Sequence, residues 1–202
     1  MKKFVRLNSP SSFASGALVT SAPVNSRTFE LEISINFGSN SLSPYSGAAL
    51  LFTNSTFKLG EIFGLASDFK GFAAVIDTHL EKIFLIENYE ELTEGQVGNA
   101  SSCEFKSTNR QKVIQLKVLE NYFEVLVKDK SFKKCAGIQI RNLKFLFFAV
   151  ASNLDNNTNV LFDVLQIQAR EVEDEETTNK LLRDLDKELG EEVQKLKIKW
   201  IC

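Results

Sequence analysis

The chain has 202 residues, of which 44% are hydrophobic, and it carries a formal net charge of −2. This length and apolar fraction suffice for one good-sized core with room for an appendage. Because positive and negative charges nearly balance, no basic excess indicates a nucleic-acid partner. The chain also lacks an uninterrupted apolar run of the roughly 18 residues that a membrane-spanning helix needs.

The first two thirds of the chain have the pattern of β-strands. Residues 29–37 alternate apolar and polar side chains, as in a strand with one buried and one wet face. Similar runs bounded by turn residues predict strands at 47–53, 71–77, 82–89, 143–152 and 159–170. The runs 112–119 and 122–129 flank Glu120 and Asn121 and predict a hairpin with a two-residue turn. About ten strands and no helix before residue 170 predict an all-β fold, an antiparallel sandwich.

Beyond residue 170 the character of the chain changes. Residues 171–202 are charged and helical in pattern, which predicts a sandwich over residues 1–170 followed by a helical tail. Thr177 or Thr178 can cap the helix. The tail has about two leucine heptads where a coiled coil usually has three or four. Both a surface helix packed on the sandwich and the start of a coiled-coil stem therefore stay open.

The cysteines and the histidine do not by themselves indicate a catalytic or metal site. Cys103, Cys135 and Cys202 lack the close spacing of a zinc site. Composition leaves open whether they are three free thiols or one disulfide and a spare. The single histidine, His79, lies two residues after Asp77, but no nucleophile motif accompanies the pair. We therefore expect no catalytic residues and no enzymatic activity.

An ordered set of short motifs resembles the legume-lectin-like (L-type lectin-like) domain of ER–Golgi cargo receptors. The set comprises Arg6-Leu7, Gly16, Gly60, Phe63-Gly64, Phe69, Gly71 and Asp77, followed by Cys103 and Cys135 on either side of the predicted hairpin. Their order over residues 4–170 carries the resemblance, since no single motif is specific. The resemblance implies a divergent member with a concanavalin A-like (jelly-roll) sandwich and a Cys103–Cys135 disulfide.

The resemblance also implies a site in which a calcium ion fixes a loop that binds sugar hydroxyls. The matching carbohydrate-binding positions are Ser46, Asp77, Asn153 and Asp155, and the matching metal-binding positions are Asp77 and Glu81. Ser46 replaces the sugar-orienting carboxylate of the family, and the residues after Asp77 lack the family's aromatic and Asn. Because ligand number and charge set calcium affinity, we expect a degenerate site with no required cofactor; calcium is the weaker alternative.

The function implied is that of a lumenal binding domain of a secretory-pathway cargo transport receptor in the ER or Golgi. Its partners would be cargo glycoproteins or a partner receptor, and a homo- or hetero-oligomer would form through the C-terminal helix. Two alternatives stay open: a mannose-binding lectin with a rearranged cation site of Asp77, Glu81 and Asp155, and a protein-interaction domain that binds no glycan.

The resemblance further implies a leader before this chain and a single membrane anchor after it, so that the membrane is reached only through segments outside the chain. Three Asn-x-Ser/Thr triplets, which begin at Asn54, Asn99 and Asn156, fit a lumenal protein.

Overall fold

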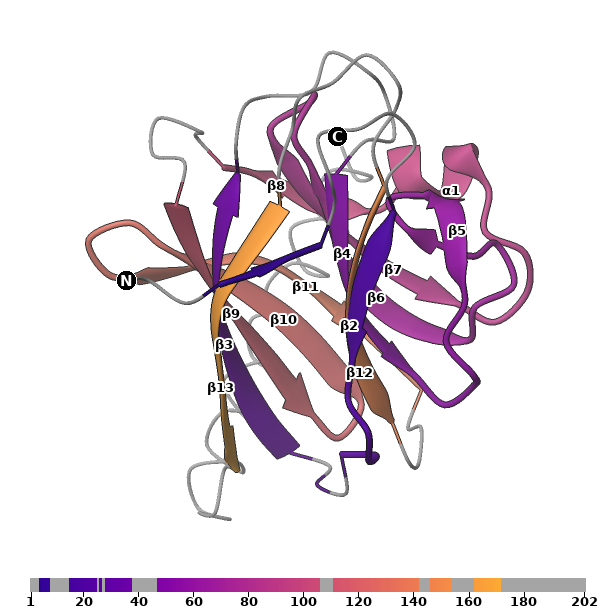
Figure 1. Ribbon diagram of the computed structural model, residues 1–202, viewed down its shortest axis with the longest axis horizontal. Helices are drawn as coiled ribbons and strands as arrows, with labels where there is room; N and C mark the ends of the chain where they lie inside the picture. Colours follow the sequence, from indigo (N-terminus) through magenta and orange to yellow (C-terminus); the bar gives the residue numbers. More distant parts are fainter. Residues whose placement is uncertain are drawn as a thin grey trace, which may run out of the picture.

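The computed structural model describes residues 4–7, 15–24, 26, 28–37, 47–105, 111–141, 146–153 and 162–171. These residues form thirteen strands and one short helix (Figure 1). The elements are β1 (Val5–Arg6), β2 (Gly16–Val19), β3 (Thr28–Phe37), β4 (Gly47–Thr53), β5 (Leu59–Ile62), β6 (Gly71–Asp77), β7 (Lys82–Asn88), α1 (Glu94–Gly98), β8 (Ser101–Glu104), β9 (Gln111–Leu119), β10 (Tyr122–Lys128), β11 (Phe132–Gln139), β12 (Phe147–Asn153) and β13 (Phe162–Glu171).

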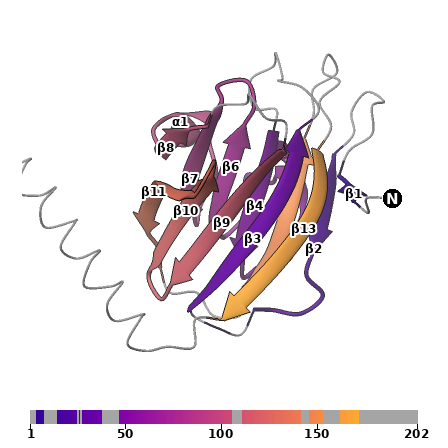
Figure 2. The ribbon, with the colours of Figure 1, turned by 90° about the vertical axis from the view of Figure 1, so that its left-hand side faces the viewer.

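Two six-stranded sheets lie face to face as a sandwich (Figure 2). The first sheet has the strand order β1-β13-β3-β9-β10-β11, and the second has the order β2-β12-β4-β6-β7-β8. The ladders within both sheets are antiparallel, as when β13 pairs with β3 across more than a hundred residues of chain. This arrangement confirms the predicted all-β, concanavalin A-like sandwich. The predicted tail helix and most of residues 171–202 lie outside the described residues.

The core between the sheets is built from the inward-facing side chains of both layers. The alternation in β3 has the predicted effect, because its five apolar side chains from Phe29 to Phe37 are each at most 5% exposed. An aromatic cluster occupies the middle of the core. The Phe52 ring of β4 lies 5.1–6.0 Å, centroid to centroid, from the rings of Phe29, Phe72, Phe123 and Phe148. Such tilted and stacked rings bury much of the apolar area of a core.

The second sheet is also covered on its outer face, which explains why β4 and β6 are apolar without interruption. The outer layer consists of connecting segments rather than a third sheet. Phe63, Leu65 and Phe69 pack on this face from the segment around β5, and Leu92 and Val97 pack on it from around α1. Both faces of β4 and β6 are therefore shielded from solvent, as the apolar runs predict.

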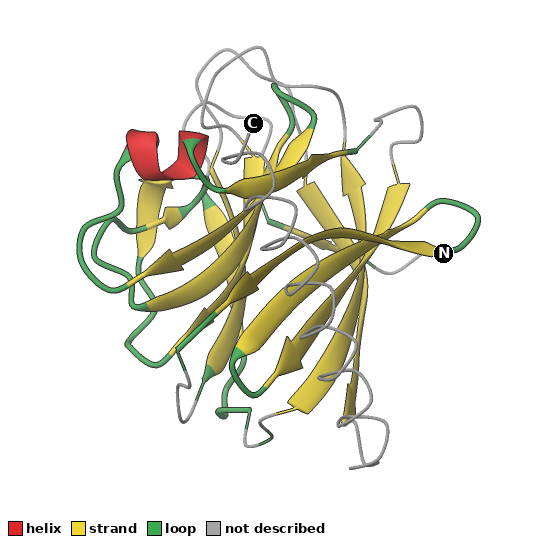
Figure 3. Ribbon diagram, turned by 180° about the vertical axis from the view of Figure 1, so that it is seen from behind, coloured by secondary structure: helices red, strands yellow, loops and turns green. Residues whose placement is uncertain are grey.

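The structure corrects the expectation that no helix precedes residue 170. α1 is a single turn among the strands (Figure 3). It is started by a capping box, in which the Thr93 hydroxyl accepts from the Gln96 backbone N–H and the Gln96 side chain accepts from the Thr93 N–H. None of the helical structure in the described part of the chain has the length and apolarity needed to cross a bilayer.

Strand prediction fails mainly where strands are short or irregular. The strands predicted by range are all present in the described residues, and the starts of the two predicted at 143–152 and 159–170 lie outside those residues. The sequence patterns miss β1, β2, β5, β8 and β11. Four of these are at most four residues long, which is too short for a period to show. In β11 the alternation is broken by a bulge at Cys135.

Candidate functional site

Two of the residues that match a binding site, Asp77 and Asn153, lie at the same end of the strands of the second sheet, which we call the loop edge. Antiparallel pairing aligns Asn153, the last residue of β12, with Gly47, the first of β4, and it aligns Gly47 with Asp77, the last of β6. The same row continues through Lys82 of β7 to Glu104 of β8. Because neighbouring strands lie about 4.8 Å apart, roughly 10 Å separates Asp77 from Asn153.

The other predicted site residues are placed less completely. Ser46, which precedes Gly47, and Asp155, which follows Asn153 by two positions, lie outside the described residues. The structure describes the backbone of Asn153 but not the position of its side chain. The fold therefore brings Asp77 and Asn153 to the same edge.

Glycines let the backbone pack closely behind the loop edge. A Cβ at Gly47 would overlap the carbonyl oxygen of Ile76 and touch the Phe63 ring. Gly64 has a φ of +84°, and a Cβ there would press against the backbone of β12. These are positions where glycine is required by space or by backbone conformation. The Phe63-Gly64 motif thus has a structural role, since it lays the Phe63 ring against β4.

Asp77 closes the turn that follows β6. Its Oδ1 atom accepts hydrogen bonds from the backbone N–H groups of His79 at 2.8 Å and Leu80 at 2.9 Å. Glu81 completes the turn with a φ of 53°, and its carbonyl oxygen accepts from the Phe105 N–H at 2.9 Å. Asp77 is only 3% exposed. An aspartate that bonds its own following backbone in this way stabilises a tight turn.

Burial raises the pKa of the Asp77 carboxyl above its ordinary value. The cause is loss of water, which disfavours the charged form. Hydrogen bonds from Leu80 and His79 and the charge of the His79 imidazole act in the opposite direction but are smaller. Ionising the Asp77 carboxyl is therefore less favourable in the folded protein than in the unfolded chain.

The pKa shift predicts how Asp77→Asn changes stability with pH. The folded-state pKa lies above the unfolded value, so the protonated form is favoured by folding; that advantage is complete below the ordinary pKa of 3.8 and is lost as pH rises through the folded pKa. The asparagine Oδ1 can accept the same two hydrogen bonds but does not titrate. We expect the unfolding free energy of the wild type, relative to that of D77N, to fall as pH increases from about 3 to 7.

Urea denaturation of both proteins in EDTA at several pH values measures this difference. The exposed residue Asp129 supplies a matched control, Asp129→Asn. A wild-type advantage that grows with pH would contradict the prediction, because it would mean that the turn hydrogen bonds stabilise the charge more than burial destabilises it.

The described residues do not supply a calcium cage. Within the part of the chain that the structure covers, no three His, Cys, Asp or Glu side chains gather closely enough to hold a metal ion. Calcium takes six to eight oxygen ligands. The turn after β6 offers the carboxylates of Asp77 and Glu81, and Oδ1 of Asp77 is already shared by two N–H donors. These residues alone do not fit the ion that the family resemblance implies.

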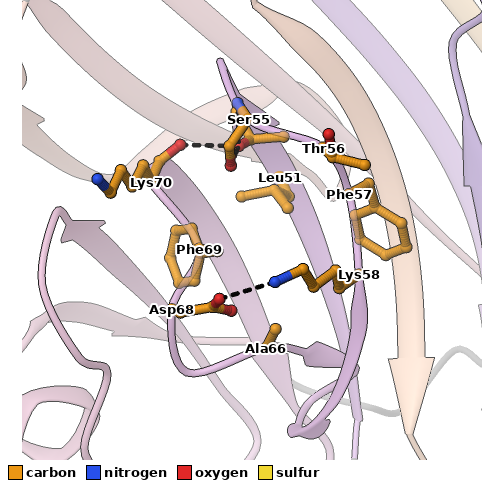
Figure 4. A pocket seen from close by; sticks show the side chains of 10 residues that line it. Leu51, Ser55, Thr56, Phe57, Lys58, Ala66, Asp68, Phe69 and Lys70 are labelled. Carbon is orange, nitrogen blue, oxygen red and sulfur yellow. Dashed lines mark hydrogen bonds and ion pairs between the residues drawn. The ribbon is translucent and has the colours of Figure 1, made fainter.

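A hollow of about 310 Å³ lies at the opposite end of β4 and β6. Its floor is apolar, with Leu51, Phe57 and Phe69, and the Lys58 Nζ atom binds the Asp68 carboxylate at 2.9 Å across it (Figure 4). Because β4 has seven residues, the hollow lies roughly 20 Å from the loop edge. It is therefore separate from the predicted site.

A disulfide joins the two sheets beside the loop edge. It links Cys103 of β8 to Cys135 of β11, with a Cα–Cα distance of 5.3 Å. In β11, Lys134 pairs with Leu126 and Ala136 pairs with Val125, so that Cys135 is an extra, bulged residue. A bulge redirects a side chain, and here it lets Cys135 join Ala136 against the core, where Cys103 also packs. The structure thus contains the disulfide that the resemblance implies.

Sequence reasoning misses a second hollow, which lies beside this disulfide. We call it the basic hollow; its volume is about 400 Å³, and its lining includes Lys112, Lys128, Lys133, Lys134, Glu104 and Asp129. One signal was available in the sequence. Lys112 continues the apolar alternation of β9, in which every second residue from Ile114 to Val118 is buried. A lysine at a core-facing position must reach water with its ammonium group. Near the end of a strand it therefore indicates that the two sheets separate there.

Comparisons with known proteins agree with this architecture. The VIP36 exoplasmic/lumenal domain in its Ca²⁺/Man3GlcNAc-bound form has a TM-score of 0.76 and 17% identity, covering 87% of this chain and 81% of that one. The legume lectin-like domain from Entamoeba histolytica has a TM-score of 0.73 and 15% identity, covering 85% of each chain. The Emp47p carbohydrate recognition domain has a TM-score of 0.68 and 14% identity, covering 83% and 82%.

At such identities these structures share the fold. No curated protein matches the chain by sequence. The model of the legume-like lectin family matches residues 1–178, which is most of the chain. Together with the sandwich topology and the ordered motifs, this match shows that the chain belongs to the legume-like lectin family.

Proposed function

We propose that this domain is the lumenal cargo-binding domain of a secretory-pathway receptor and that it binds cargo without calcium-dependent recognition of mannose. The receptor role is supported by similarity to VIP36, whose matching structures are of an exoplasmic/lumenal domain. Emp47p and Emp46p contribute carbohydrate recognition domains of the same fold. The family is generally non-enzymatic, which agrees with a binding role.

The second part of the proposal is carried by the Asp77 turn. In this chain the carboxylate is buried and holds the backbone of a four-residue turn, instead of standing free in a longer loop. A cation on Oδ1 would compete with two N–H donors, and the 3% exposure of Asp77 leaves little access to the carboxylate as a whole. Affinity for calcium falls as the number of charged ligands falls, so we expect dissociation constants no tighter than roughly 10⁻⁴ to 10⁻³ M.

A lumenal location is supported by two further features. The Cys103–Cys135 disulfide requires an oxidising compartment to persist. Asn54 and Asn99, each the first residue of a glycosylation triplet, are exposed. A protein-interaction domain that binds no glycan remains the second candidate, because the turn residues at the loop edge serve the fold.

A glycan array probed with and without calcium tests the proposal. We expect no calcium-dependent binding to mannose-containing glycans, and we expect wild type and D77N to give the same profile. The VIP36 domain, whose structures include calcium and mannose-bound forms, serves as the positive control. Calcium-dependent mannose binding that disappears in D77N would overturn the proposal, because Asp77 would then be a ligand as well as a turn residue.

A further inference from the structure

The basic hollow lies at the same end of the sandwich as the loop edge. Glu104, which lines it, aligns with Lys82 and through Lys82 with Asp77, so roughly 10 Å of sheet separates its wall from the Asp77 strand. Phe105 also lines the hollow, and its backbone N–H binds the carbonyl oxygen of Glu81 in the Asp77 turn. A ligand in the hollow would therefore lie beside the edge that carries the family's predicted sugar positions.

Two of its lysines occupy positions that elsewhere face the core. Lys112 has the same parity in β9 as the buried residues Ile114 and Leu116. Lys133 pairs with Val127, and directly paired residues point to the same face of a sheet. Because Val127 packs against the core, Lys133 is directed between the two sheets where the sandwich opens.

The lysines of the hollow differ in their ion pairs. Neither Lys112 nor Lys133 forms an ion pair with any residue that the structure describes. Lys134, in contrast, lies 3.8 Å from the Glu124 carboxylate. With Lys134 paired to Glu124, three lysines and two carboxylates of the lining remain, which leaves the hollow with a small positive excess in a chain whose net charge is −2. Two inward-directed cations with no ion-pair partner among the described residues attract an anion into the space between them.

The chemistry of the lining indicates which anion. Lysine binds phosphate and sulfate as a compact point charge. The volume of about 400 Å³ falls within the range of roughly 300–1,000 Å³ that is typical of small-ligand pockets. Val127 and Phe105 add an apolar surface on which a sugar ring can lie. We propose that the basic hollow binds the phosphate- or sulfate-bearing sugar of an acidic glycan, with Lys112 and Lys133 facing the anion.

The proposal names a ligand class for the proposed function. It depends on that function only for the expectation that the ligand is a glycan. It gives the domain a way to select glycans by charge where the family uses a calcium ion. A sugar anchored in the hollow would direct the next residues of the glycan toward the loop edge, since the hollow and the loop edge lie at the same end of the sandwich.

Titrations of the whole chain in EDTA at low salt test the proposal, with mannose 6-phosphate, mannose 6-sulfate, mannose and inorganic phosphate as probes. We expect at least one charged sugar to bind about tenfold or more tightly than mannose, and its affinity to fall with added salt. The variant K112Q/K133Q should lose at least about tenfold in that affinity. The matched control K58Q/K70Q removes two lysines of the other hollow and should bind as the wild type does.

Each alternative result has a defined meaning. The proposal is overturned if neither charged sugar binds more tightly than mannose, or if K112Q/K133Q binds them unchanged while remaining folded by circular dichroism. Inorganic phosphate that binds as tightly as the sugar phosphate would also overturn it, because the sugar would then contribute nothing. Comparing phosphate with sulfate identifies the acidic group. Failure of the proposed function is separate, since it would appear as calcium-dependent mannose binding that is sensitive to D77N.

Discussion

Replacing Phe52 with alanine is expected to lower the free energy of unfolding by about 3–5 kcal/mol, among the largest effects of any single change in this chain. Phe52 is fully buried, and its ring contacts four others from both sheets. The neighbours are held by two separate hydrogen-bonded layers, so they cannot easily move into the space left by the ring. For a domain of this size the loss corresponds to a fall in melting temperature of roughly 6–20 °C.

Chemical denaturation followed by far-ultraviolet circular dichroism measures the effect. Leu80→Ala is the matched control, because Leu80 is also a large apolar residue but is 52% exposed. We expect that variant to stay within about 0.5 kcal/mol of the wild type. A loss below about 1.5 kcal/mol for Phe52→Ala would show that the aromatic cluster collapses around the cavity and that its packing is not restrained by the two sheets.

Much of the fold could be predicted because the patterns that define it are local. β3 alternates over its whole length, and β4 and β6 are apolar between turn residues, so existence and bounds follow from short stretches of sequence. Strand order could not be predicted from the residues alone. The pairing of β13 with β3, for example, depends on which strands bury their faces together, and many strand orders satisfy the same alternation.

Elements that depend on a detail of pairing or capping were harder to predict. The bulge at Cys135 removes the period that would reveal β11, and it becomes visible only when β11 is paired with β10. α1 has a recognisable signal, since Thr93 and Gln96 have the spacing of a capping box. Its five residues are too few for a helical period, and a capping motif without a following apolar stripe is not enough to predict a helix.

For the site, the position of Asp77 was easier to predict than its role. The end of an apolar run identifies the residue, and the register then places it in one row with Gly47 and Asn153. Its bonds to His79 and Leu80 depend on the shape of the turn. The basic hollow is less visible still, because Lys112 and Lys133 are distant in sequence and converge only when β9, β10 and β11 are aligned.

The second large effect is expected from the disulfide. The double variant C103S/C135S should unfold with a free energy about 3–4 kcal/mol lower than that of the oxidised wild type, because the bond closes a loop with a sequence separation of 32. Its place in the fold supports a large effect. β8 is the last strand of one sheet and β11 the last strand of the other, so the bond joins two edge strands that share no ladder.

Denaturation of the variant and of the wild type with and without reductant measures the contribution. Reduced wild type should match C103S/C135S, and Cys202→Ser should match the oxidised wild type. Equal stability of oxidised and reduced wild type would contradict the prediction.

The two cysteines also test the cellular compartment of the domain. When thiols are blocked before cells are opened, the chain from its own cells should yield Cys103 and Cys135 as one linked peptide. Free thiols at both positions would count against a lumenal domain, because an oxidising lumen is what lets such a bond persist.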